Sequence, residues 1–298
     1  MSLHVANSIV SGASGFVGRS LVSHLDAAPV QLHLGEDDWL EQVRAADYPG
    51  ATVFHLAAKV HGAGVDTEAA FVHDNVDKTV ALAQAAADGG ARRFVFLSSV
   101  KVNGEETADR PYRASDSPAP EDAYGRTKWQ AEQALARMSG MEVAIVRSPL
   151  VYGAGVKGNL LELMRLADSS LPLPLAGMNN RRSFVHVDDL ARLLVECAVS
   201  PKVVGGTFMA AHPDSTSTTR LVQTIRGFLG RPPRLFHVPA AFLEGLASLG
   251  AQGTKMRRLT RSLEVDASET QRILAWTPQI AFDTSVEDMV RAYRESLG

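Results

Sequence analysis

The segment Tyr124-Gly-Arg-Thr-Lys128 places a phenol and an ammonium group four residues apart. On a helix, residues i and i+4 lie on one face, so these two side chains would be neighbours. A tyrosine with an ordinary pKa of about 10 is a weak base at neutral pH, and a nearby cation lowers that pKa. The pair therefore predicts proton transfer with a hydroxyl group of a bound molecule. The same spacing is common on solvated helix faces, so its meaning depends on the residues around it.

A glycine-rich turn precedes this pair in the chain. Residues 12–18, Gly-Ala-Ser-Gly-Phe-Val-Gly, follow a short apolar run and open an amphipathic segment. Glycines allow a tight turn and let backbone N–H groups approach a pyrophosphate at a helix N-terminus. The spacing is GxxGxxG instead of GxGxxG, and the alternative is a turn that needs glycine only for packing. The placement predicts a dinucleotide-binding turn formed by Gly12, Ser14, Gly15, Phe16, Val17 and Gly18.

Short apolar runs alternate with longer amphipathic ones along the first half of the chain. Strands are expected at 8–10, 30–34, 52–56, 93–97 and 143–146, and helices at 16–25, 37–46, 67–87 and 122–138. Alternating elements of this kind predict a parallel sheet with helices on both faces, and the continuous apolar strands indicate burial on both sides. The fold class is therefore α/β, a Rossmann-type doubly wound parallel sheet.

The pattern beyond residue 149 is less regular and predicts a smaller C-terminal α/β substrate lobe. Prolines and a glycine within 171–177 predict a loop there. A short strand is expected at 183–187, then a helix from Asp189, and further elements at 206–210, 217–229, 235–238, 240–249 and 281–297. We predict a dinucleotide-binding domain over 1–153. A mainly substrate-binding lobe would span 154–298, with segments near 183–210 returning to the first domain.

The composition limits the class of protein. The 298 residues are 45% hydrophobic and 21% charged with a net charge of −3, which gives no electrostatic case for binding nucleic acid or an anionic membrane. No apolar run approaches the roughly 20 residues that span a bilayer, and no signal-peptide pattern is present. Cys197 is the only cysteine and is expected to pack in a helix, so neither a disulfide nor a thiolate metal cluster is predicted. A cytoplasmic protein is expected.

An ordered series of motifs runs along nearly the whole chain. It consists of the glycine turn, His55-Leu-Ala-Ala58, Asn75, Ser98-Ser99, Tyr124 with Lys128, Arg147-Ser-Pro-Leu-Val-Tyr-Gly153 and Arg182-Ser-Phe-Val-His-Val-Asp-Asp189. With this series the chain resembles the extended short-chain dehydrogenase/reductase family, specifically its NAD-dependent epimerase/dehydratase group. The resemblance is nearest to nucleotide-sugar 4-epimerases and 4-keto-sugar reductases.

The resemblance implies a catalytic trio of Ser99, Tyr124 and Lys128 beside a nicotinamide ring. The expected cofactor is NAD, with NADP left open. Glu36 and Asp37 could accept from a ribose 2′-hydroxyl, as NAD requires, or equally cap the following helix. Besides the glycine turn, Tyr124 and Lys128, the resemblance implies cofactor contacts from Leu56, Ala57, Ala58, Asn75, Ser98, Ser148 and Pro149.

The resemblance also implies a nucleotide-diphosphate sugar as substrate. Arg182 matches a diphosphate-binding arginine, Arg261 lies near a second such position, and arginine suits the task because it forms bidentate bonds to phosphate. Asn159 matches an asparagine near the substrate phosphate, while Ser99 and Tyr124 would contact the sugar. His61 and Lys101 could also face the sugar, but the sequence does not place them.

Two departures from the family pattern stand out. Val102-Asn103-Gly104, preceded by Lys101, replaces the usual Val-Tyr-Gly and resembles a bacterial branch that acts in surface-polysaccharide pathways. Val100 and Lys101 also stand where 4,6-dehydratases carry an Asp-Glu pair, which disfavours that reaction. The second departure is the shortened region between residues 25 and 52, which could weaken adenosine binding.

Three functions remain open on the sequence. The preferred one is an epimerase or oxidoreductase acting at C4 of a nucleotide-diphosphate sugar, similar to UDP-hexose 4-epimerases. A reductase of a UDP-4-keto-sugar needs the same trio, and a non-catalytic dinucleotide sensor or scaffold is the alternative from a different class. Retention of the whole trio argues against the scaffold. Family members often dimerise through two long helices, here 67–87 and 122–138, so a homodimer is expected.

Overall fold

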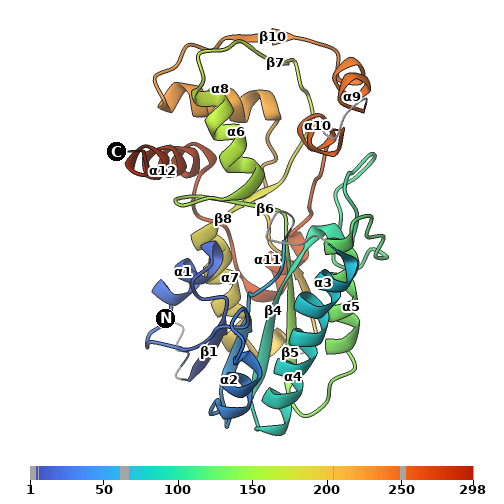
Figure 1. Ribbon diagram of the computed structural model, residues 1–298, viewed down its shortest axis with the longest axis vertical. Coiled ribbons are helices and arrows are strands. Elements are labelled where there is room, and N and C mark those ends of the chain that lie inside the picture. Colours follow the sequence, from blue (N-terminus) through green and yellow to red (C-terminus); the bar gives the residue numbers. More distant parts are fainter. Residues whose placement is uncertain (1–4, 6, 61–66, 204, 249–252, 298) are drawn as a thin grey trace.

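The computed structural model describes residues 5, 7–60, 67–203, 205–248 and 253–297. A sheet flanked by helices forms the lower lobe in Figure 1, and a smaller group of helices with short strands forms the upper lobe. Among the described residues, no helix is long and apolar enough to cross a membrane.

The lower lobe is built on six parallel strands in the order β2-β1-β3-β4-β5-β9. They are β1 (Ser8–Ser11), β2 (Val30–Leu32), β3 (Thr52–His55), β4 (Arg93–Ser99), β5 (Glu142–Ser148) and β9 (Thr207–Met209). The order reverses direction between β1 and β3, as it does in doubly wound folds that bind ligands at the carboxyl ends of their strands. The predicted Rossmann-type fold is confirmed.

Neighbouring residues of each strand enter two different hydrophobic layers, because strand side chains alternate between faces. Val10 and Val95 pack with helices α1 (Phe16–Ser23) and α7 (Val187–Val199) on one face. Ile9 and Phe94 pack on the other face, against helices α2 (Trp39–Ala45), α4 (Lys78–Asp88) and α5 (Ala123–Leu135). Figure 1 shows these two helical layers on either side of the sheet. Cys197 lies fully buried in α7, as expected, and burial raises the pKa of its thiol.

The long helix expected over 67–87 contains an irregular turn. Thr67 caps helix α3 (Glu68–Val72), the π-helical turn His73–Asp77 follows, and α4 continues from Lys78. A π-helical turn holds one more residue than an α-helical turn, and such turns are frequent at functional sites. Here the turn carries Asn75 on its buried side.

The upper lobe has its own hydrophobic core, formed mainly by α6 (Gly158–Asp168), α8 (Thr218–Phe228) and α12 (Phe282–Glu295). Strand β7 (Leu173–Ala176) pairs with β10 (Leu235–His237). The prediction of a loop at 171–177 is therefore wrong over 173–176, because pairing with a strand far along the chain outweighs the local effect of proline. Helices α9 (Ala240–Ser248) and α10 (Gly253–Thr260) follow β10. Helix α11 (Ser268–Leu274) then packs into the core of the sheet lobe before the chain reaches α12.

The chain passes between the lobes several times. Strand β6 (Leu150–Tyr152) follows β5 out of the sheet and pairs with β8 (Phe184–His186), and the chain then returns through α7 and β9 to the edge of the central sheet. We propose a division near residue 153, with α7 and β9 belonging to the dinucleotide-binding domain.

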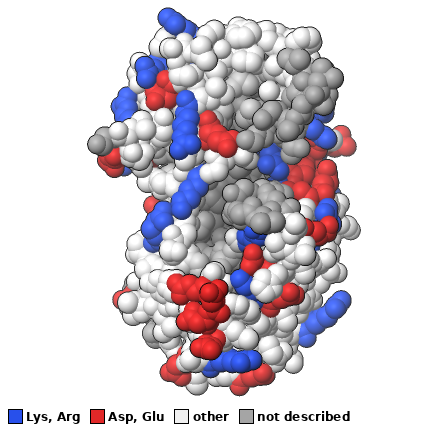
Figure 2. All heavy atoms as spheres, in the orientation of Figure 1, with Lys and Arg blue, Asp and Glu red and all other residues white. Residues whose placement is uncertain are grey.

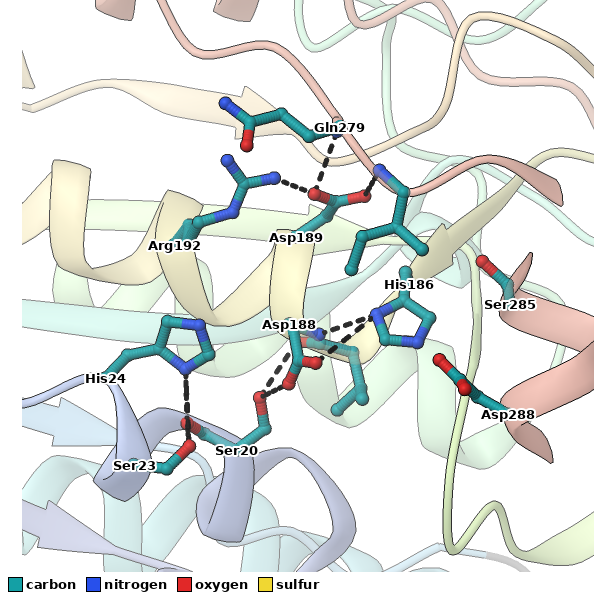
Figure 3. A network of polar contacts seen from close by, with 12 residues as sticks. Ser20, Ser23, His24, His186, Asp188, Asp189, Arg192, Gln279, Ser285 and Asp288 are labelled. Atoms are coloured by element: carbon teal, nitrogen blue, oxygen red, sulfur yellow. Dashed lines mark hydrogen bonds and ion pairs between the residues drawn. The ribbon is translucent and has the colours of Figure 1, made fainter. Parts of the chain in front are cut away.

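A turn at the start of α7 holds the two lobes together (Figure 3). The Nδ1 atom of His186 accepts a hydrogen bond from the Asp188 amide at 3.2 Å. The Asp188 carboxylate accepts from the Ser20 hydroxyl on α1 at 2.6 Å. This turn therefore fixes the helix that begins at the glycine turn against the strand that enters the upper lobe.

Asp189 attaches the C-terminal segment to the same turn. Its fully buried carboxylate accepts from the backbone amides of Gln279 at 3.0 Å and Ile280 at 3.2 Å, and it pairs with Arg192. The Asp189 carbonyl accepts from the Trp276 indole at 3.1 Å. Because residues 279–280 lead directly into α12, this carboxylate ties the core of the upper lobe to a helix of the lower lobe.

We expect Asp189→Ala to lower the free energy of unfolding by about 3 kcal/mol, because two amides and a guanidinium lose a buried anionic acceptor. Urea denaturation followed by circular dichroism measures the loss. The matched control is Asp214→Ala, whose side chain is 86% exposed and which should change stability by less than about 0.5 kcal/mol. Equal losses in the two variants would contradict the assignment.

Candidate active site

Ser99, Tyr124 and Lys128 meet at the carboxyl end of β4. Ser99 ends the strand, and Tyr124 lies in the first turn of α5, hydrogen-bonded to the Ser99 hydroxyl. Gly125 lets the helix approach this closely, since a Cβ atom there would lie 2.7 Å from the Lys101 carbonyl oxygen. Asp122 begins the helix by accepting the Gly125 amide at 2.7 Å, so an N-cap fixes the position of the phenol.

The phenol does not have the lowered pKa that the sequence suggests. Burial raises the pKa of Tyr124 to about 12, the Asp122 carboxylate adds to the rise, and the hydrogen bond with Ser99 opposes it. Burial also lowers the pKa of Lys128 to about 7, against the opposing effect of Glu132. The expectation that Lys128 makes Tyr124 acidic is thus wrong for this arrangement, because loss of hydration on burial is the largest influence on the pKa of each group.

The ammonium group of Lys128 is directed toward the carboxyl end of β4. Its ammonium group donates to the Leu97 carbonyl at 2.8 Å and sits 4.2 Å from the centre of the Phe96 ring. The carbonyl dipole and the ring face both favour a cation. The side chain is therefore held in one position next to Tyr124.

A chain of buried side-chain hydrogen bonds crosses the floor of the site. The Ser11 hydroxyl lies 2.5 Å from His55 Nδ1, His55 Nε2 lies 2.7 Å from the Thr79 hydroxyl, and Thr79 donates to the Asn75 carbonyl at 2.8 Å. The Asn75 amide donates to the Thr127 hydroxyl at 3.1 Å. Burial lowers the pKa of His55 to about 3, so the ring is neutral and the chain carries no charge. It joins β1, β3, α4 and α5.

Asn75 also fixes the segment that follows β3. Its side-chain oxygen accepts the Lys59 amide at 2.7 Å, and its nitrogen donates to the Lys59 carbonyl at 3.1 Å. Ala57 and Ala58, the small residues assigned to the cofactor, lie just before this clamp. The amides of Leu56 and Ala57 both donate to the Ser11 carbonyl, at 3.0 and 3.1 Å. The clamp therefore holds Leu56–Ala58 alongside the glycine turn.

The glycine turn has the shape that a dinucleotide needs. Gly12 has a φ of +82°, and a Cβ there would lie 2.7 Å from the Ala57 amide nitrogen. A Cβ on Gly18 would lie 2.1 Å from the Gly12 carbonyl oxygen. Gly15 is the N-cap of α1 and cannot offer a side-chain oxygen, so the first amides of the helix are directed at whatever lies above the turn. These residues fit a pyrophosphate.

The other residues of the turn take different positions. The Ser14 carbonyl accepts from the Arg19 guanidinium at 2.6 Å. Val17 packs against the sheet core, whereas Phe16 packs against the core of the upper lobe. The turn is thus held from both lobes.

The acidic residues after β2 are exposed and lie at the carboxyl end of that strand. Glu36 accepts from the Gln42 side chain at 3.0 Å, which also donates to Asp38 at 2.7 Å. Asp38 occupies the N-cap position of α2. Neither Glu36 nor Asp37 is therefore the cap that the alternative interpretation required. The shortened region still forms an edge strand paired with β1.

A buried ion pair between Glu132 and Arg147 links α5 to the carboxyl ends of β4 and β5. Glu132 accepts from Arg147 at 2.6 and 3.0 Å, and both side chains are no more than 3% exposed. The Ser98 hydroxyl donates to Glu132 at 2.5 Å, and Asn103 accepts from Arg147 at 3.1 Å. The Ser98 side chain is directed into this network, away from the glycine turn.

Ser148 and Pro149 lie beside Ser99. Ser148 ends β5 directly opposite Ser99 in the strand register, and both Ser148 and Pro149 are buried. They occupy the same sheet edge as Ser99.

A cavity of about 360 Å³ in the upper lobe is lined by two of the five predicted substrate residues, Arg182 and Asn159. Its remaining wall is mainly aliphatic, with Arg258 as a second cation. Burial lowers the pKa of Arg182 to about 10, with Arg258 adding to the effect. Within the described part of the chain, the Nε atoms of both arginines are buried without a hydrogen-bond partner.

Arg261 does not reach this cavity with its side chain. It is half exposed and pairs with Glu244, while its carbonyl accepts from Arg182 at 3.0 Å. Lys101 does not line this cavity and pairs with Glu105 and Asp122. His61 lies outside the described residues.

Sequence reasoning missed Arg258 and Glu132. Arg258 belongs to the run Arg257-Arg258, whose only signal is charge, and spacing along the chain does not show which of the two faces a cavity. Glu132 follows Lys128 by one helical turn, so its proximity to the lysine could have been found from spacing.

Comparison with known proteins gives the relatives of this chain. The model of the NAD dependent epimerase/dehydratase family matches residues 8–208. A UDP-glucose 4-epimerase from Vibrio cholerae is 34% identical over 315 aligned residues, covering 97% of this chain and 95% of that protein.

Solved structures share the fold. The UDP-glucose 4-epimerase of Thermotoga maritima with UDP-glucose has a TM-score of 0.77 at 19% identity, covering 98% of this chain and 100% of that one. MoeE5 in complex with UDP-glucuronic acid and NAD has a TM-score of 0.76 at 22% identity, with the same coverage.

We expect Glu132→Gln to cost about 3–5 kcal/mol of stability, because it leaves Arg147 as a buried cation without a counter-charge. Chemical denaturation checks this value. The control is Glu142→Gln. Glu142 also pairs with a buried arginine, Arg93, but the Glu142 side chain is 38% exposed. In this variant Arg93 keeps its hydrogen bonds to two backbone carbonyls. Its loss should be about 1 kcal/mol. The interpretation fails if Glu142→Gln is the more damaging change.

We expect Gly12→Ala to abolish NAD⁺ binding measured by isothermal titration calorimetry. The new Cβ would require an unfavourable backbone conformation and would displace the Ala57 amide. The control is Gly227→Ala in α8, where a Cβ meets nothing within 4 Å, and which should bind NAD⁺ like the parent. Unchanged affinity in Gly12→Ala would remove this turn from the cofactor site.

Proposed function

The chain belongs to the NAD-dependent epimerase/dehydratase family, and we propose that it is a nucleotide-sugar 4-epimerase acting on a UDP-hexose. The observation that carries the proposal is the convergence of Ser99, Tyr124 and Lys128 at the carboxyl end of β4, on the same edge of the sheet as the glycine turn. The similarity to UDP-glucose 4-epimerase over 97% of the chain supports the choice of substrate.

We propose NAD as the cofactor, held by the glycine turn, by Leu56–Ala58 and by Lys128. Exposed Glu36 and Asp37 at the end of β2 suit a free ribose 2′-hydroxyl and oppose a 2′-phosphate. When bound, NAD supplies the acceptor and then the donor of the hydride at the sugar C4.

The three side chains would divide the proton chemistry at the sugar 4-oxygen. Tyr124 takes the hydroxyl proton as C4 is oxidised to a ketone, and returns it when C4 is reduced on the opposite face. Ser99, already hydrogen-bonded to Tyr124, orients the same oxygen. When protonated, Lys128 places positive charge close to the phenol and favours the phenolate that accepts this proton; its ammonium group is fixed by Leu97 and Phe96. The sugar is unchanged in composition and inverted at C4.

The cavity in the upper lobe would hold the nucleotide. Arg182 and Arg258 present two cations to a diphosphate, and Asn159 on α6 adds a polar contact. The aliphatic wall would cover the base and exclude water. Arg261 contributes through its carbonyl, which holds the Arg182 side chain, and we propose it as a positioning residue.

A reductase of a UDP-4-keto-sugar is the second candidate. The raised pKa of Tyr124 favours the protonated phenol, which is the form that donates a proton to a ketone oxygen. In such a reaction the chemistry stops after one hydride delivery.

We infer that the protein forms a homodimer through α4 and α5. These helices cover one face of the sheet, and their outer sides carry the half-buried apolar residues Val80 and Trp129. Burial of such residues stabilises helix pairs across an interface.

We expect Tyr124→Phe to reduce 4-epimerase turnover by about 10²–10⁴-fold while NAD⁺ affinity stays unchanged. The assay combines UDP-glucose, UDP-N-acetylglucosamine and their 4-keto forms with NAD⁺ and NADH, and follows sugar products by chromatography. Tyr112→Phe is the control, because Tyr112 donates to the Glu106 carbonyl away from Ser99. Interconversion without added cofactor supports the epimerase; consumption of NADH with only the 4-keto forms supports the reductase. No turnover of any sugar by the parent would overturn both.

A further inference from the structure

Lys101, Glu105, Asp122 and Arg258 form a compact group of charges, called here the Asp122 cluster. The Lys101 ammonium lies 2.7 Å from the Glu105 carboxylate and pairs more closely still with Asp122. Arg258 on α10 reaches the same two carboxylates at 3.8 and 3.7 Å. All four side chains are only 20–24% exposed. Figure 2 shows acidic and basic side chains together at the right-hand edge, at the level where the lobes meet.

The cluster borders a small cleft of about 210 Å³ between the lobes, separate from the nucleotide cavity but sharing Arg258 with it. Lys101 lies in the 3₁₀ turn Val100–Val102 directly after Ser99. The cluster thus connects the end of β4, the start of α5 and a helix of the upper lobe.

Asp122 is the member of the cluster that acts on Tyr124. It is the N-cap of α5 and stands two residues before the tyrosine. Burial works against its charge, but Lys101 and the Gly125 amide outweigh burial and hold the pKa of the carboxyl below its ordinary value. An anion is therefore fixed near a phenol whose ionised form is also negative, and the pKa of Tyr124 rises in response.

We propose that Lys101 is a positioning residue that sets the acid–base strength of Tyr124, by neutralising the Asp122 carboxylate at the start of the helix that carries the tyrosine. The residue that replaces the acid of 4,6-dehydratases in this chain thereby acts on the catalytic phenol without touching the sugar. The effect on the phenol is independent of the substrate; only its consequence for turnover rests on the proposed 4-epimerase or reductase function.

The direction of the effect follows from the charges that face Tyr124. On α5 these are Asp122 and Lys128; from β4, Ser99 donates a hydrogen bond. Asp122 in turn faces Lys101, Glu105 and Arg258. Removing Lys101 leaves Asp122 less compensated and makes the phenolate harder to form, so the pKa of Tyr124 rises. Removing the charge of Asp122 lowers that pKa.

The two changes can be made with little damage to the fold. Asp122→Asn keeps an oxygen that accepts the Gly125 amide, so the N-cap is retained. Lys101→Gln keeps the length of most of the side chain. Lys101→Arg keeps the charge and serves as the conservative control. A purely structural role for the cluster would make Asp122→Asn and Lys101→Gln change the phenol in the same direction, or not at all.

The test measures the phenol directly. All five tyrosines are replaced by a fluorinated tyrosine that titrates near neutral pH, and the fluorine resonance of Tyr124 is assigned by its loss in Tyr124→Phe. The resonance is followed against pH in the full chain. We expect Lys101→Gln to raise the pKa of this residue by about one unit and Asp122→Asn to lower it by about one unit. Lys101→Arg should match the parent.

The double variant Lys101→Gln with Asp122→Asn completes a thermodynamic cycle. Because Lys101 acts through Asp122, its removal should have little further effect once Asp122 is neutral, and the double variant should titrate like Asp122→Asn alone. Additive effects of the two changes, or shifts of the same sign in the single variants, would overturn the proposal.

Turnover is measured separately in unlabelled protein. In the oxidative direction the acidic limb of the kcat profile should move to higher pH in Lys101→Gln and to lower pH in Asp122→Asn. If the resonance shifts as expected but the parent turns over no sugar, the proposed function fails and the inference about Lys101 stands. If the parent is active and the resonance does not shift, the inference about Lys101 fails alone.

Discussion

The side-chain amide of Asn75 is the contact on which the geometry of the site depends. It clamps the backbone of Lys59 through both amide atoms and donates to Thr127 on α5. Its own carbonyl continues the chain of hydrogen bonds that leads through Thr79 and His55 to the strand beside the glycine turn. A buried amide satisfied on all sides permits only one arrangement of its partners, because any slip leaves a polar atom without a bond. The π-helical turn is the local distortion that brings this amide inward.

The charges of the site are buried and balanced in pairs. Lys128 lies between the Leu97 carbonyl, the Phe96 ring and the nearby Glu132, and Glu132 is held by Arg147. Burial alone would leave both Tyr124 and Lys128 neutral at physiological pH. Neighbouring carboxylates then change these pKa values: Asp122 raises the pKa of Tyr124 further, and Glu132 raises the pKa of Lys128 back toward its ordinary value.

The two lobes are joined by polar contacts at opposite sides of the cleft. Asp189 ties the entry to α12 to α7, and Arg258 on α10 pairs with carboxylates at the start of α5. The same Arg258 lines the cavity of about 360 Å³ in the upper lobe. One side chain therefore links that cavity to the start of the helix that carries Tyr124.

The sequence by itself determined the elements and the kind of site. Strand and helix periods, the glycine turn and the Tyr124–Lys128 spacing are local patterns, and local patterns follow from steric and hydrophobic rules that act over a few residues. Only the tertiary structure decided that β7 is a strand and that the Ser98 side chain is directed toward Glu132. It also decided that the Arg258 side chain lines the cavity, whereas Arg261 supports Arg182 through its backbone carbonyl. It also reversed the expected pKa shift of Tyr124. These outcomes depend on burial and on charges brought together from distant segments, and neither quantity is defined until the chain has folded.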